Sequence, residues 1–322
     1  MSRDPSAETI RVGQVEVPPG RAQRADLPVA QLPTQDELSI PIEVVNGVEP
    51  GPKLWVNAAI HGDEINGVEI VRALLDELQP DQLAGALIAV PIVNVFGLVH
   101  GSRYLPDRRD LNRSFPGRED GSLAARLAHL FMVEIVDQCT HGIDLHTGSN
   151  ERTNLPHLRA DLSDERTRAF AEALGAPIML DSSAPRGSLR SAVQRLKKPI
   201  VAFEAGESGR LEPKAVRIGL EGILRVMDYL GMREHADRPR NYTPREAGKK
   251  AWIRAGRAGI LRLRRKAGDR VEEGDCLGTI GDAFDADLCE VCAPFDGIVL
   301  SHLNNPLVHQ GDAVIHLASL KD

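Results

Sequence analysis

Residues 53–78 read KLWVNAAIHGDEINGVEIVRALLDEL, and the fold class follows from the pattern in this stretch. Residues 53–60 are mostly apolar and have the length of a buried strand. From Ile65 to Leu78 the large apolar side chains recur at spacings of three and four residues, which is typical of an amphipathic helix. A buried strand that leads directly into a helix is the repeating unit of α/β proteins.

The same alternation continues along the chain. Further short apolar segments, which we expect to be strands, are 38–45, 86–93, 142–148, 177–180 and 199–206. Segments with helical spacing are 122–139, 164–174, 188–196 and 211–230. They predict an α/β domain over residues 38–232 whose mostly buried sheet is covered by helices on both faces. Residues 1–37 are polar without a sustained period, so we expect an irregular or extended N-terminal extension.

The last part of the chain has a different character. Residues 233–250 are charged and contain two prolines, which is typical of a linker. Residues 271–280 match residues 308–317 at an offset of 37, and this repeat predicts a small all-β domain over 251–322. The repeat resembles the barrel of lipoyl and biotinyl carriers. No lysine occurs between Lys266 and Lys321, and the expected tip (281–287) offers none, so we interpret the barrel as a structural or oligomerisation module.

Composition excludes several classes of protein. A net charge of -7 and an aromatic content of 4% argue against a nucleic-acid partner. The longest apolar stretch, 87–99, contains Pro91 and Asn94 and is too short to span a membrane. The N-terminus lacks the apolar core of a signal peptide, and four cysteines do not make a disulfide scaffold, so a cytoplasmic location is expected. Cys289 and Cys292 have C-x₂-C spacing, but there is no second such pair for a structural zinc site.

Two short motifs follow predicted strands and supply metal-binding groups. His61 and Glu64 lie three residues apart in one strand-to-helix turn, and His146 ends the strand 142–148. Together they supply a His₂Glu set with an open fourth position, the pattern of catalytic zinc hydrolases. Asp144, two residues before His146, lies on the same strand face and is placed to orient its imidazole from outside the ligand set.

Two further motifs supply groups for substrate and proton transfer. Asn112 and Arg113 offer an amide and a guanidinium, which suit a carboxylate or a polarised carbonyl. Upstream, Arg103 adds positive charge to the same loop. Glu204 ends the apolar strand 199–206, where partial desolvation would raise its pKa toward general-base duty. The alternative is that Glu204 is simply the first solvated residue after that strand.

In order and context, these motifs resemble the succinylglutamate desuccinylase/aspartoacylase family of the zinc-carboxypeptidase clan. They are HGDE (61–64), DLNRSFPG (110–117), DLHTG (144–148) and FEAGE (203–207). The resemblance implies a three-layer α/β/α domain with a mixed, largely parallel sheet and one zinc ion per chain. It implies His61, Glu64 and His146 as zinc ligands and Glu204 as the base. It also implies Asn112, Arg113 and Arg103 as substrate-binding residues.

The expected reaction is hydrolysis of the amide bond of a small N-acyl amino acid by metal-activated water, with Glu204 as general base. The acyl group and the amine stay open, as do the native metal and a homo-oligomeric state. A zinc carboxypeptidase or cell-wall peptide amidase is the alternative within enzymes. A protein that binds a metal or an acyl ligand without catalysis is the alternative outside them.

Overall fold

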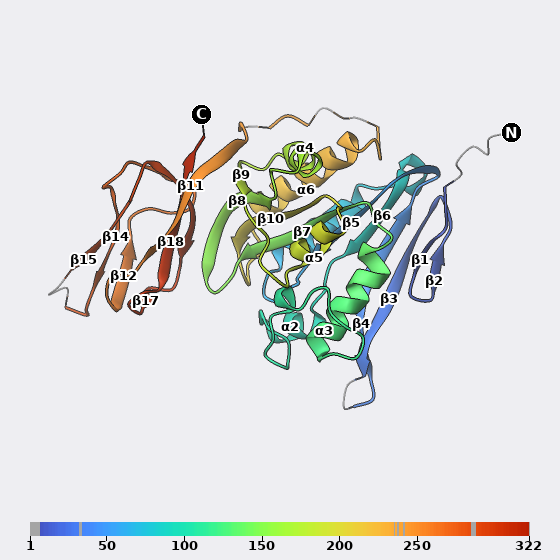
Figure 1. Ribbon diagram of the computed structural model, residues 1–322, viewed down its shortest axis with the longest axis horizontal. Coiled ribbons are helices and arrows are strands. Elements are labelled where there is room, and N and C mark those ends of the chain that lie inside the picture. The colour runs from blue at the N-terminus through green and yellow to red at the C-terminus, as the bar shows by residue number, and fades with distance from the viewer. Residues whose placement is uncertain are drawn as a thin grey trace.

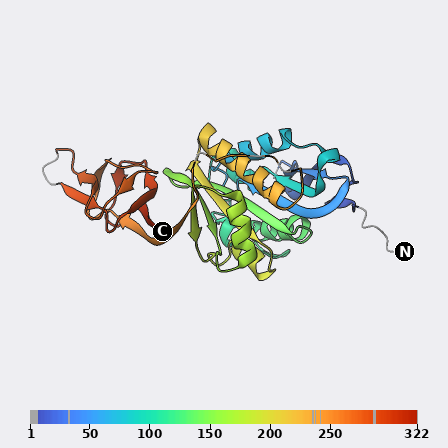
Figure 2. The same ribbon diagram turned by 90° about the horizontal axis from the view of Figure 1, so that it is seen from above.

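The computed structural model describes residues 7–31, 34–234, 236, 238–240, 242–284 and 288–321. An α/β part is followed by a C-terminal β region, coloured orange to red, at one end of the molecule (Figure 1, Figure 2). The helical segments are α1 Asn66–Asp76, η1 Pro80–Gln82, α2 Val95–His100, η2 Leu111–Arg113, α3 Leu123–Phe131, η3 Met132–Val136, α4 Glu165–Leu174, α5 Leu189–Arg195 and α6 Pro213–Tyr229. No described helix is both long enough and apolar enough to cross a membrane.

The strands form one long sheet and two smaller ones. Their bounds are β1 Ile10–Val12, β2 Val15–Val17, β3 Arg21–Gln31, β4 Glu37–Asn46, β5 Glu49–Ala58, β6 Ala84–Val90, β7 His141–Gly148, β8 Arg152–Ala160, β9 Ile178–Asp181, β10 Ile200–Glu207, β11 Arg245–Arg254, β12 Gly259–Leu263, β13 Arg270–Val271, β14 Cys276–Gly281, β15 Cys289–Cys292, β16 Gly297–Leu303, β17 Leu307–Val308 and β18 Ala313–Leu320. Within the described residues, the long sheet has the order β13-β16-β18-β11-β9-β8-β10-β7-β5-β6-β4-β3. Strands β6, β5, β7 and β10 are parallel neighbours, whereas β8 is antiparallel to β10.

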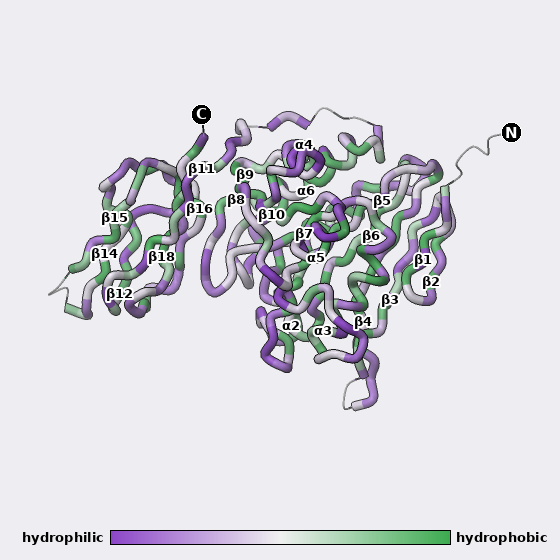
Figure 3. Tube along the Cα trace, viewed as in Figure 1, coloured by the Kyte–Doolittle hydropathy of each residue, from purple (hydrophilic) through white to green (hydrophobic). Residues whose placement is uncertain are grey.

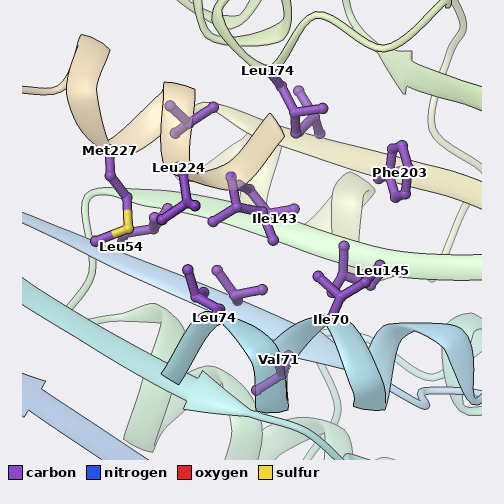
Figure 4. Close-up of a cluster of buried hydrophobic side chains, with 14 of the residues drawn as sticks. Leu54, Ile70, Val71, Leu74, Ile143, Leu145, Leu174, Phe203, Leu224 and Met227 are labelled. Carbon is purple, nitrogen blue, oxygen red and sulfur yellow. The ribbon is translucent and has the colours of Figure 1, made fainter. Parts of the chain in front are cut away.

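Helices cover both faces of the central strands, which confirms the predicted three-layer α/β/α fold. On one face, α1, α4 and α6 pack on β5, β7 and β10 in a continuous buried cluster. Figure 4 shows Ile70 and Leu74 of α1 and Leu224 of α6 directed toward Ile143 on β7. On the other face, α3 and α5 pack with β3 and β4 in a second cluster. The hydropathy view shows the central strands green, with purple concentrated in peripheral loops (Figure 3).

The N-terminal extension contains more regular structure than its sequence indicated. Residues expected to form an irregular or extended entry contain β1, β2 and β3, and β3 pairs antiparallel with β4 along most of its length. The physical reason is an alternation in β3 that the polar composition obscured, since Ala25, Leu27 and Val29 are buried and the residues between them are exposed. The segment thereby forms one edge of the sheet. Residues 1–6 and 32–33 lie outside the described residues.

The predicted linker also contains a strand. β11 begins at Arg245, inside the segment 233–250, and pairs in parallel with β9 through Arg245 and Glu246. Farther along, β11 pairs with β18, so the sheet continues from the α/β part into the C-terminal β region. β16 adds a second connection through its antiparallel pairing with β8. Residues 235, 237 and 241 of the predicted linker lie outside the described residues.

The C-terminal β region contains three turns with the same hydrogen bonds. In each turn a glycine with positive φ precedes an aspartate whose carboxylate accepts from the backbone N–H three residues earlier. The pairs are Gly268–Asp269, Gly274–Asp275 and Gly311–Asp312, with φ of 98°, 88° and 93° and distances of 2.9, 3.3 and 2.8 Å. The second and third belong to the predicted repeat, and the first is an additional turn of the same kind. The resemblance to a carrier barrel stays a prediction, and residues 285–287 of its expected tip lie outside the described residues.

Candidate metal centre and active site

The turn after β5 places His61 and Glu64 at the carboxyl ends of the central parallel strands. Ligand sites of open α/β sheets form at this edge. Gly62 lies in the same turn, and a Cβ there would come within 1.9 Å of the backbone of Gly97. Only glycine fits that close approach to α2, which fixes the path of the turn.

Glu64 lies between two imidazoles. Its Oε1 is 2.7 Å from His61 Nδ1 and its Oε2 is 2.8 Å from His146 Nδ1. Glu64 and both histidines are buried. Burial alone would raise the pKa of Glu64, but the two neighbouring imidazoles hold it well below its usual range. The ligand atoms of all three side chains lie within 4.8 Å of one another, so this group is able to hold a metal ion.

Asp144 holds His146 from the side opposite Glu64. Its Oδ2 is 2.9 Å from His146 Nε2, and its Oδ1 accepts a hydrogen bond of 2.7 Å from Asn57 Nδ2. Burial opposes the charged imidazolium, but Asp144 and Glu64 raise the pKa of His146 well above its usual value. The structure therefore places the Asp144 carboxylate against the His146 imidazole, and its orienting role stays a prediction.

Arg103 points from its loop toward the same group. Its guanidinium donates to Asp110 Oδ2 at 2.8 Å and to Ser149 Oγ at 2.6 Å, and it lies 3.6 Å from Glu64 Oε1. Burial would raise the pKa of Asp110, but His61 and Arg103 hold it well below its usual range. Arg103 is thus engaged by a carboxylate of the protein itself, and its predicted contact with substrate stays a prediction.

Asn112 and Arg113 lie on η2 and line the same cavity as His61. The Asn112 Oδ1 accepts a hydrogen bond of 2.9 Å from Leu189 N, at the start of α5. This bond fixes the amide in orientation. Arg113 is exposed and donates at 2.6 Å to the Asn112 carbonyl oxygen, and no described carboxylate pairs with it.

Glu204 lies on β10 beside His146 of the parallel neighbour β7. Its carboxylate is largely buried, with a side-chain exposure of 16%. Oε2 accepts a hydrogen bond of 2.8 Å from Asn154 Nδ2, and Arg159 Nε lies 3.3 Å from Oε1. Glu204 is therefore held between two polar side chains of β8 rather than solvated freely beyond the strand.

One cavity of about 410 Å³ joins these residues. Its lining also includes residues that sequence reasoning missed: Arg152, Asn154 and Arg159 of β8, Arg190 of α5, Trp252 of β11 and Ala313 of β18. Arg190 is 5% exposed and, among the described residues, donates only to oxygens of Ser182 and Ser183. Burial lowers its pKa to about 10. A charged residue inside a predicted amphipathic helix was the signal that could have identified it.

The C-terminal β region supplies one wall of the cavity. Trp252 stacks on its cross-strand partner His316, with ring centroids 4.4 Å apart and planes inclined by 7°. The Arg152 guanidinium lies 5.7 Å from the indole centroid and donates to the Ala313 carbonyl oxygen at 3.0 Å. These contacts fix the two parts of the chain against each other at the site.

Comparisons with known proteins agree with this geometry. The Nα-acetyl-L-2,4-diaminobutyric acid deacetylase of Halomonas elongata is 29% identical over 295 residues, which cover 87% of this chain and 86% of that protein. A crystal structure of succinylglutamate desuccinylase/aspartoacylase from Rhodobacter sphaeroides has a TM-score of 0.83 at 30% identity, covering 94% of this chain and 96% of that one. The product-bound ectoine utilization protein EutE (DoeB) of Ruegeria pomeroyi has a TM-score of 0.85 at 23% identity, covering 99% and 100%, which shows a common fold.

A match to a family model identifies the family of this chain. Residues 50–230 match the succinylglutamate desuccinylase/aspartoacylase catalytic domain, which is more than half of the chain. This stretch contains all four motifs on which the resemblance was based. The chain therefore belongs to the succinylglutamate desuccinylase/aspartoacylase family, whose members are deacylases.

Proposed function

We propose that this protein is a zinc-dependent deacylase that hydrolyses the amide bond of a small N-acyl amino acid. His61, Glu64 and His146 would hold the metal, and Glu204 would be the general base. The observation that carries the proposal is that all four side chains line one cavity at the carboxyl ends of the central strands. Asn112 and Arg113 line the same cavity and would contact the substrate.

The residues present fit a zinc ion. Two imidazole nitrogens and a carboxylate oxygen are the ligand set of many catalytic zinc sites. His61 Nε2 is buried and makes no hydrogen bond within the described residues, although Asp110 Oδ1 lies 3.4 Å away. A bound zinc ion would polarise the scissile carbonyl and lower the pKa of a water molecule.

The protein's own groups would handle the proton. Asn154 fixes one oxygen of the Glu204 carboxylate, and Arg159 lies beside the other. Held in this way, Glu204 would accept a proton from the attacking water and return it to the leaving amine. Asp144 would keep the His146 ring in a single orientation throughout.

The charges of the cavity support an anionic substrate. Arg113, Arg152 and Arg190 line it, and within the described residues they donate only to carbonyl and hydroxyl oxygens. Guanidinium groups without a carboxylate partner suit the carboxylate that every N-acyl amino acid carries. The relative from Halomonas elongata is named for a substrate of this kind.

The size of the cavity supports a small substrate. Trp252 and Ala313 of the C-terminal β region form part of the lining. These two residues would shorten the part of the cavity that lies beyond the scissile amide bond of the substrate. A peptidase needs an extended groove instead, so this wall favours a deacylase over a carboxypeptidase or cell-wall peptide amidase.

The test combines metal analysis with a substrate panel. Wild type, Glu204→Gln and His146→Ala are compared by elemental mass spectrometry and by amine release from N-acetyl and N-succinyl amino acids and short peptides. Glu207→Gln is the control, because Glu207 ends the same strand but pairs with Arg210 and does not line the cavity.

We expect about one zinc ion per chain in wild type and Glu204→Gln, and loss of zinc in His146→Ala. Glu204→Gln should lower kcat by about 10²- to 10⁴-fold. Full activity in that variant would refute the assignment of the base. Cleavage of peptides alone would favour the peptidase, and bound metal without hydrolysis of any member of the panel would favour a non-catalytic binding protein.

A further inference from the structure

The C-terminal β region contains two cysteines that face each other across neighbouring strands. Cys276 begins β14 and Cys292 ends β15, and the antiparallel register pairs these two residues, with an irregularity of the ladder between Cys276 and Gly278. Both are free thiols in the structure. Cys289, on the same strand as Cys292, is instead paired with Ile280.

The position of the pair in the ladder brings the two residues close. The Ala293 N–H donates to the Asp275 carbonyl oxygen at 2.9 Å, so the next pair along, Cys276 and Cys292, falls at a non-hydrogen-bonded position. Cα atoms at such positions are about 4.5 Å apart. Disulfides span Cα separations of roughly 4.4 to 6.8 Å. Directly opposed side chains also project from the same face of a sheet.

Both thiols are accessible to a reagent from solution. Cys292 is exposed and Cys276 is partly exposed. Cys289 lies three residues before Cys292, so its side chain projects from the opposite face of the strand. A Cβ at Gly256 would lie 3.1 Å from the Cys289 sulfur, which places that thiol against a different part of the chain.

We propose that Cys276 and Cys292 form a reversible disulfide-forming site that reacts with a small disulfide oxidant such as glutathione disulfide. Neither residue lines the catalytic cavity, so the site is separate from the proposed deacylase centre. The bond would close residues 277–291 into a loop. It would thereby hold β14 and β15 together at the base of their hairpin.

The reaction is balanced with glutathione disulfide as the only co-reactant. One cysteine thiolate attacks a sulfur of glutathione disulfide, forms a mixed disulfide and releases one glutathione thiolate. The facing thiolate then attacks the cysteine sulfur of the mixed disulfide and releases the second glutathione. The two cysteines lose two electrons and two protons, and glutathione disulfide becomes two molecules of glutathione.

The surroundings of Cys292 predict how the rate depends on pH. Desolvation and the negative charge of Glu290 raise the pKa of the Cys292 thiol above its ordinary value. Because the thiolate is the attacking species, oxidation should accelerate with increasing pH.

The experiment uses the full-length protein in buffers of defined glutathione to glutathione disulfide ratio. Free thiols are alkylated, and the protein is digested without reduction by two proteases, one that cleaves before aspartate and one that cleaves after glutamate. Asp282 lies between Cys276 and Cys289, and Glu290 lies between Cys289 and Cys292, so each cysteine falls on its own peptide and the mass of a linked pair identifies the two cysteines joined. Cys276→Ser and Cys292→Ser should abolish the linked species. Cys289→Ser is the matched control, from the same strand but the opposite face.

We expect the linked pair in wild type and in Cys289→Ser, and its disappearance when glutathione is added in excess. Linkage of Cys289 to either partner would overturn the proposal. Detection of only mixed disulfides with glutathione in wild type would also overturn the proposal. Thiols that stay unmodified in excess glutathione disulfide would overturn it as well. Because the bond is read directly in wild type, poor folding of a serine variant would not obscure the result.

Discussion

His316 is a buried neutral histidine that should make the protein sensitive to acid. It is 5% exposed, stacks on Trp252 and has no hydrogen-bond partner for Nδ1 among the described residues. Burial, together with the positive charges of Arg159 and Lys250, lowers its pKa from 6.5 to about 3. The folded state therefore excludes a proton that the unfolded chain accepts readily.

The sign and the size of this effect of pH on the free energy of unfolding follow from the linkage between proton binding and unfolding. Between pH 6.5 and pH 3 the unfolded state binds more protons at this site, so the free energy of unfolding falls as the pH falls. Each pH unit within this window contributes about 1.4 kcal/mol. Between about pH 7.5 and about pH 5, His316 should therefore cost the folded state about 2 kcal/mol.

The measurement compares the free energy of unfolding of two proteins at two pH values. Urea unfolding of wild type and His316→Gln is followed by far-ultraviolet circular dichroism at both pH values, and the pH-dependent losses are subtracted, so that titration of all other groups cancels. His309→Gln is the control, because His309 is an exposed histidine of the same region. We expect wild type to lose about 2 kcal/mol more than His316→Gln. Equal losses in these two proteins would refute the reasoning.

Four further outcomes test the site and its packing. Asn154→Ala removes the 2.8 Å hydrogen bond to Glu204 and should lower kcat by about 10- to 100-fold with little change in KM. The reason is that hydrogen bonds to charged groups contribute about 1.5–3 kcal/mol. Steady-state kinetics in which only KM changes would contradict this prediction. Phe203 is fully buried in the core, so Phe203→Ala should lower the free energy of unfolding by about 3–5 kcal/mol, as measured by urea titration. A loss below about 1 kcal/mol would contradict the packing described. Trp252→Ala should increase kcat/KM for long N-acyl chains relative to acetyl, whereas Trp252→Phe should preserve the preference. Removal of metal by a chelator should lower the Tm of wild type and leave that of His146→Ala unchanged, as measured by calorimetry.

The sequence was informative where chemistry and periodicity occurred together. The carboxyl-terminal half of β5 and most of β7 and β10 are buried and largely apolar, and polar residues with chemical groups stand at or just beyond their carboxyl ends. That abrupt change from apolar to polar is the pattern from which His61, His146 and Glu204 were predicted as site residues. The helices were recognisable because apolar residues of α1 and α6 recur along one face.

β8 was missed because polar residues occupy two of its buried positions. Asn154 and His157 are both buried, and Pro156 interrupts the strand between them. Strand prediction depends on apolar or β-branched residues, whereas Asn154 is buried because it bonds to Glu204. Trp252 is likewise beyond sequence reasoning, since only tertiary packing brings β11 to the cavity.

The long sheet continues through β11 from the α/β part into the C-terminal β region, and this continuity has a consequence for engineering the protein. β9 pairs with β8 on one side and with β11 on the other, and Ile178 and Leu180 of β9 are buried together with Ala247, Ile298 and Leu300. Truncation before residue 245 would leave β9 with a free edge and an uncovered apolar surface. Such edges template intermolecular pairing and aggregation. The C-terminal β region therefore covers an edge of the α/β part that would be open to such pairing, and chimeras between relatives should exchange β9, β11 and β18 as one unit.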